Sequence, residues 1–109
     1  MINVNLVRGD KGINEITVKG HSGYVEIGKD IVCSSVSTAM ILTINLLSKL
    51  NVNFSYESDD KIPFISLNVE DVNSLDFDLV QTILENLVDN LSEVEKQYKK
   101  YLKIYEIRR

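Results

Sequence analysis

The residues best suited to chemistry in this chain are its single cysteine, Cys33, and its single histidine, His21, which lie 12 positions apart. A thiolate attacks carbonyl carbons and an imidazole can take the thiol proton, so the pair could form a nucleophilic cysteine–histidine site. One thiol excludes a disulfide within the chain and a dithiol redox site. It also excludes a structural zinc site within one chain, which takes about four Cys or His ligands. No cofactor is expected. The one metal site that Cys33 and His21 could still form is one shared between two copies of the chain.

Cys33 is expected near the start of a helix. Apolar residues recur at three- and four-residue spacings over residues 32–49, and Asp30 can cap the helix N-terminus. Cys33 would then lie in the first turn, where unpaired N–H groups and the helix dipole favour a thiolate, although the Asp30 carboxylate opposes this effect. The same spacing places Cys33 on one stripe with Val36 and Met40, so a buried packing role is the alternative.

His21 lies in a segment, residues 20–30, that has neither a helical nor a strand period. Gly20 and Gly23 flank the histidine and permit backbone angles that other residues avoid. We expect a loop that brings the imidazole to the thiol. The alternative is a surface connection in which the histidine has no chemical role.

The elements that must position this pair follow from the apolar pattern. Alternating residues predict two hairpins, over residues 2–7, 13–18, 54–56 and 64–69. A long amphipathic helix is expected from about residue 75 to residue 100. Residues 104–107 suit either a continuation of the second helix or a short closing strand, and we favour the strand. The order β-β-α-β-β-α-(β), without a repeat or linker, predicts an α+β fold in which a small sheet packs against two helices as a two-layer single domain over residues 1–109.

Length and composition agree with one compact domain. The chain has 109 residues, of which 44% are hydrophobic and 26% charged, enough for one core without disulfides or metals. The first residues do not combine a basic segment with an apolar one, and no run approaches the roughly 20 apolar residues of a membrane span. We therefore expect a cytoplasmic protein without a membrane partner.

Residues 20–37 resemble the signature of the ribosomal-processing cysteine protease family Prp. They read GHSGYVEIGKDIVCSSVS, whereas the family has Gly-His-Ala followed, after a short spacer, by Gly-x-Asp-Ile-Val-Cys-Ala-Ala-Val-Ser. The order, the spacing and both candidate residues coincide over these 18 of 109 residues. Ser22, Ser34 and Ser35 replace alanines, which are changes between small residues.

The resemblance implies that Cys33 is the nucleophile and His21 the general base of a cysteine endopeptidase. Asp30 matches the acidic position of the motif, where it either orients the imidazole or caps the helix, and Gly20 and Gly23 belong to a loop that opens for substrate. In this mechanism we expect the backbone N–H groups of Cys33 and Ser34 to hold the oxyanion. The implied substrate is the N-terminal extension of the large-subunit ribosomal protein L-twenty-seven, removed after a short apolar segment that ends in an aromatic residue. The implied assembly is a homodimer.

Charge is unevenly distributed along the chain. Residues 96–109 carry a net charge of +5, which leaves −9 for residues 1–95 because the whole chain carries −4. An acidic body would attract a basic ribosomal protein, unless the charges only complement the dipole of the second helix. Without an aromatic-rich motif or an overall positive charge, no direct nucleic acid binding is expected. The alternative function is a non-enzymatic, ribosome-associated binding module in which Cys33 is structural.

Overall fold

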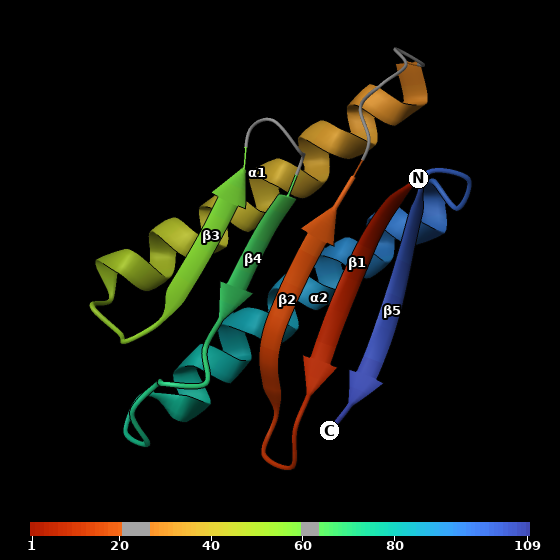
Figure 1. Ribbon diagram of the computed structural model, residues 1–109. Helices are drawn as coiled ribbons and strands as arrows, with labels where there is room; N and C mark the ends of the chain where they lie inside the picture. Colours follow the sequence, from red (N-terminus) through yellow and green to blue (C-terminus); the bar gives the residue numbers. More distant parts are fainter. Residues whose placement is uncertain (21–26, 60–63) are drawn as a thin grey trace.

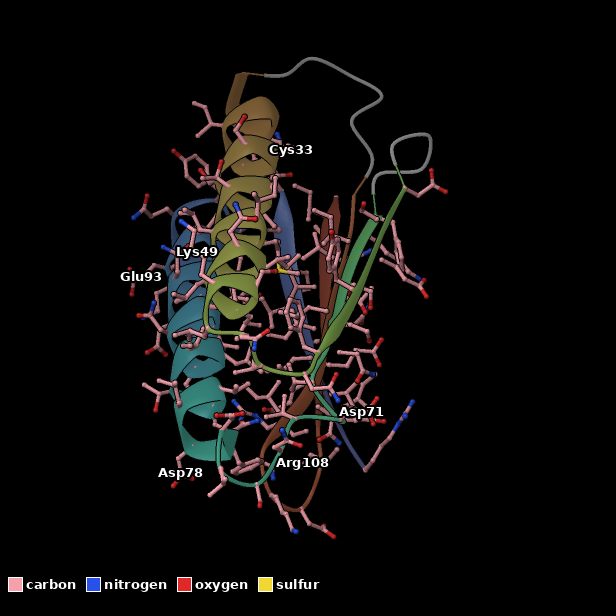
Figure 2. The ribbon with its side chains drawn as sticks, turned by 90° about the vertical axis from the view of Figure 1, so that its left-hand side faces the viewer. Cys33, Lys49, Asp71, Asp78, Glu93 and Arg108 are labelled. Carbon is pink, nitrogen blue, oxygen red and sulfur yellow. The ribbon has the colours of Figure 1, made fainter. Side chains whose placement is uncertain are left out.

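The computed structural model describes residues 1–20, 27–59 and 64–109, with the backbone alone for residues 27–30. These residues form a five-stranded sheet with two helices on one face (Figures 1 and 2). The elements are β1 (Ile2–Arg8), β2 (Ile13–Lys19), α1 (Ile27–Lys49), β3 (Ser55–Asp59), β4 (Phe64–Asn68), α2 (Phe77–Gln97) and β5 (Leu102–Arg108). The predicted α+β fold and element order are confirmed, including the closing strand.

The sheet has the strand order β3-β4-β2-β1-β5. β1 and β2 form the first hairpin, β3 and β4 form the second, and β2 joins the two hairpins by antiparallel pairing with β4. β5 pairs parallel to β1 after α2 carries the chain across the sheet. β3 and β5 are therefore the two edges (Figure 1).

The core lies between the sheet and the helices. Alternate residues of β1, namely Ile2, Val4 and Leu6, are buried, as a strand with one covered face requires. Each helix adds a stripe of side chains that are at most 3% exposed: Val32, Val36, Met40 and Leu47 from α1, and Val80, Leu84, Leu87 and Leu91 from α2. Burial of one such side chain stabilises the fold by about 1.5–3 kcal/mol, so these stripes hold the two layers together.

α2 is fixed to the β1–β2 hairpin by Gln81. The Ile13 N–H donates to Gln81 Oε1 at 2.8 Å, and Gln81 Nε2 donates to the Ile13 carbonyl at 2.8 Å. Gly12, with φ at +154°, makes room for this amide, because a Cβ there would lie 2.4 Å from Gln81 Oε1. One side chain thus satisfies both backbone groups of Ile13.

Arg8 joins β1, β5 and α2 through charge. Its guanidinium donates to Glu85 of α2 at 2.7 Å and to Glu106 of β5. The hydrogen bond to Glu85, helped by Glu106, outweighs the opposing effect of partial burial and raises the pKa of Arg8 above its ordinary value. Arg8 therefore stays charged throughout the neutral range.

α1 corrects one expectation about apolar runs. Residues Ile31–Lys49 have a mean hydropathy of 1.7 and are long and apolar enough to cross a membrane by length and composition. Serines and threonines, including the pairs Ser34-Ser35 and Ser37-Thr38, hide this in the sequence, because they interrupt the apolar run without adding charge. In the folded domain α1 is a core helix over the sheet, yet Ile41 and Leu42 are 51% and 65% exposed. Its apolar surface thus exceeds what the core buries.

Candidate active site

Cys33 lines a pocket of about 480 Å³ between α1 and the sheet. The described walls come from α1 (Cys33, Val36, Ser37, Ile41, Ile44 and Asn45), from β1, β2 and the residue after β2 (Ile2, Val18 and Gly20), and from β3 and β4 (Tyr56, Ser58, Asp59, Phe64 and Ile65). Most of these side chains are apolar, and the volume is within the usual range for a ligand site. The pocket can therefore take an apolar segment of a ligand and present it to a thiol.

Cys33 has two environments at once. Its thiol is free and partly buried, and the residue packs against the core beside the buried Val36. It also faces the pocket, because it lies at the margin of the stripe that α1 buries. The packing alternative is thus correct in part, but it leaves the thiol within reach of the pocket.

Gly20 reaches the same pocket from the end of β2. A Cβ at this position would lie 2.9 Å from Ile2 Cγ1, so glycine lets the chain pass close to β1. His21 and Gly23 lie outside the described residues. The structure therefore brings Cys33 together with Gly20, the residue that precedes His21 in the chain.

The predicted start of α1 is wrong. α1 begins at Ile27, so Asp30 is the fourth helical residue rather than the N-cap, and Cys33 is in the second turn. Glycine and aspartate are both tolerated in the first turn of a helix, so Gly28 and Asp30 did not mark its boundary. Of Asp30 the structure describes only the backbone position.

This start also changes the predicted oxyanion site. N–H groups beyond the first four residues of an α-helix pair with carbonyls four residues earlier, so those of Cys33 and Ser34 belong to the helical ladder. The exposed Ser34 side chain lies in a groove between α1 and α2, where Asn86 and Asp89 also lie, and not in the Cys33 pocket. In this structure neither N–H group is available as an oxyanion donor.

Several polar residues of the pocket escaped sequence reasoning. Ser37 lies one turn after Cys33 on the pocket wall, and its spacing of four residues was the signal that could have revealed it. Asn45 lies about two turns beyond Ser37 on α1, and Tyr56 and Asp59 come from β3. No local spacing connects β3 to Cys33. Among the residues that the structure describes, no group of three or more His, Cys, Asp or Glu side chains could hold a metal ion.

The sequence matches a known protease family over nearly its whole length. The family model described as "Cysteine protease Prp" matches residues 1–103. The ribosomal processing cysteine proteases Prp of two Staphylococcus aureus strains, Mu50 and NCTC 8325, are each 26% identical to this chain, with 95% of this chain and 97% of the relative covered.

Solved structures share the fold. A Streptococcus mutans protein aligns with a TM-score of 0.90 at 21% identity, covering 100% of this chain and 96% of that one. S. aureus Prp in complex with a substrate peptide aligns with a TM-score of 0.85 at 22% identity, covering 97% and 99%. The same protease with a covalently linked product peptide aligns with a TM-score of 0.83 at 25% identity, again covering 97% and 99%. With the family model spanning the domain and a thiol on a pocket, the chain belongs to the Prp family of cysteine proteases.

Proposed function

We propose that this chain is an endopeptidase that removes the N-terminal extension of the ribosomal protein L-twenty-seven, with Cys33 as nucleophile and His21 as general base. The observation that carries the proposal is that Cys33 and Gly20 line one pocket, since His21 follows Gly20 directly. Consecutive Cα atoms are about 3.8 Å apart, so the histidine needs no long connection to reach this wall. The names of the S. aureus relatives, which are ribosomal processing proteases, support the substrate class.

The proposed reaction proceeds through a thioester. His21 takes the proton of the Cys33 thiol, and the thiolate attacks the carbonyl carbon of the scissile peptide bond. The tetrahedral intermediate collapses, the C–N bond breaks, and the imidazolium of His21 gives its proton to the leaving amine. Water, deprotonated by His21, then attacks the thioester and releases the carboxylate product and the Cys33 thiol. S. aureus Prp with a covalently linked product peptide supports such a covalent step.

The pocket walls fit the proposed cleavage site. Ile41, Ile44, Phe64 and Ile65 give the pocket that Cys33 lines an apolar wall. An apolar segment that ends in an aromatic residue would bury a large area there, since aromatic side chains carry about 150–250 Å² each. The apolar lining thus favours the substrate that the motif implies.

A second copy of the chain is the proposed partner in solution. Ile31, Leu42 and Leu46 of α1 are 45%, 65% and 43% exposed in the single chain. Exposed apolar patches of this kind are typical of interaction surfaces, and a homodimer would remove them from water. We place the protein in the cytoplasm, where its one free thiol would stay reduced.

The decisive experiment is cleavage of a synthetic peptide that carries the extension and the first residues of the mature ribosomal protein. Cys33→Ala and His21→Ala should each lower kcat/KM by about a thousandfold or more, as losses of a nucleophile or its base do. Thr38→Ala is the matched control, because Thr38 lies on the same helix but in the groove toward α2. It should cleave at the rate of the unchanged protein.

Two outcomes would overturn the proposal. Cleavage that survives Cys33→Ala contradicts the mechanism. Absence of cleavage together with retained binding of the peptide favours the non-enzymatic binding module with a structural cysteine.

A further inference from the structure

The two edges of the sheet are treated differently by the rest of the fold. Just before and just after β5, the Tyr101 carbonyl and the Arg109 N–H bond to β1. Because the bonding direction alternates along the strand, Ile104 directs its N–H away from β1. This N–H donates to Glu95 Oε2 of α2 at 2.7 Å. A carboxylate thus occupies the β5 edge, which is one way in which proteins prevent unwanted strand pairing.

β3 forms the other edge (Figure 1). Its residues Tyr56, Ser58 and Asp59 line the Cys33 pocket. All five of its residues are exposed, although strands usually bury one face. Tyr56 lies opposite the buried Leu67 and Ser58 opposite Ile65, so both side chains are on the helix-covered face. Both also line the pocket. The edge strand and the pocket therefore form one continuous surface.

A strand added beside β3 would keep this alternation. Because side chains of paired strands point to the same face at matching positions, every second residue of the added strand would face α1. It would meet Tyr56, which is 55% exposed, and would lie beside the pocket that Ile41 and Asn45 also line. The pocket then leads from these residues to Cys33.

The charge of β3 selects the added strand. Its sequence, SYESD, contains Glu57 and Asp59 and no basic residue, and residues 1–95 carry a net charge of −9. The opposite edge, β5, carries Lys103 and Arg108, and its one acidic residue, Glu106, is paired with Arg8. An extended segment with basic side chains fits β3 and is disfavoured at β5.

We propose that β3 is a docking edge: a basic, extended segment of the substrate pairs with it as a sixth strand and directs alternate side chains into the pocket toward Cys33. The inference rests on the proposed function for the identity of the substrate. The main-chain hydrogen bonds of strand addition supply affinity, and the pocket supplies the choice of side chains.

The first test measures binding of the extension peptide to the Cys33→Ala protein, which cannot turn it over. A series of peptides, each with one N-methylated backbone amide, is titrated by fluorescence anisotropy. Methylation removes a donor, so affinity should fall by about five- to tenfold at every second position and change little between them. A loss without this period of two, or no loss at any position, overturns the proposal, as does failure of the unmodified peptide to bind.

The second test separates binding from chemistry in the active protein. Glu57→Lys should raise KM for the same peptide by about two- to fivefold and leave kcat unchanged, and added salt should reduce the difference. Glu93→Lys is the control, since it makes the same charge change on α2 and loses only an exposed ion pair to Lys96. Equal effects of both variants would mean that overall charge, and not β3, governs binding.

The outcomes also separate the two proposals. If N-methylation weakens binding at every second position but the unchanged protein does not cleave the peptide, the proposed function is overturned and the docking edge on β3 still stands. Cleavage without alternation overturns the docking edge and leaves the protease.

Discussion

The two helices cover the same face of the sheet but divide their apolar residues in different ways. α2 buries Val80, Leu84, Leu87 and Leu91 along one stripe and exposes a polar face. α1 spreads apolar side chains over three surfaces: the core, the Cys33 pocket and an exposed face that includes Leu42. A helix that only holds a domain together needs one apolar stripe. The additional apolar surface of α1 therefore marks the helix that has further tasks.

The largest expected effect on stability comes from the buried stripe of α2, and it tests whether this helix contributes to stability alone. Leu84→Ala should lower the free energy of unfolding by about 2–5 kcal/mol, because Leu84 is 1% exposed and its loss leaves a cavity under the sheet. Urea denaturation measures the change. The cleavage rate per folded molecule should stay unchanged. If the total rate falls by more than the fraction of folded protein does, α2 also shapes the active site.

On α1, Cys33→Ala is expected to have the opposite effect, a loss of activity without a loss of stability. It should remove activity while the urea midpoint hardly moves, since Cys33 is only partly buried and loses one sulfur atom. Activity would then depend on a residue of α1 that contributes little to stability, unlike the buried stripe of the same helix.

A smaller effect is expected at the contact between α2 and the hairpin. Gln81→Ala should cost about 1–3 kcal/mol, because the N–H and carbonyl of Ile13 lose their partners in a part-buried position. Faster amide exchange at Ile13, measured by NMR, would locate the loss. A stability loss without faster exchange there would place the contribution of Gln81 in packing instead.

The same contrast explains what could be predicted from the sequence. The alternation of Ile2, Val4 and Leu6 and the stripe of α2 each encode one buried face, and both elements lie where they were expected. β3 carries no such code, because all its residues are exposed, and it extends to Asp59 rather than ending at Tyr56. Solvent-exposed edges leave little hydrophobic pattern to detect.

The candidate site was predictable only in part for a related reason. Cys33 and His21 stood out as single residues within a specific motif, and Gly20 was singled out beside the histidine. The start of α1 was not predictable, because its first turn contains Gly28 and no apolar period. Cys33 and Tyr56 line one pocket because the sheet order brings β3 and β4 to the side of the sheet that α1 covers (Figure 1). Local sequence does not record such long-range contacts.

The smallest expected effect on stability concerns the exposed face of α1. Leu42 is 65% exposed, so Leu42→Ser should change the free energy of unfolding of the single chain by less than about 0.5 kcal/mol. If this face is where two copies meet, the same substitution should weaken self-association, which analytical ultracentrifugation over a range of concentrations measures. Ser48→Ala, an exposed change on the same helix, is the control. A clear loss of single-chain stability would mean that Leu42 packs within the domain, and α1 would then resemble α2 more closely than its exposure indicates.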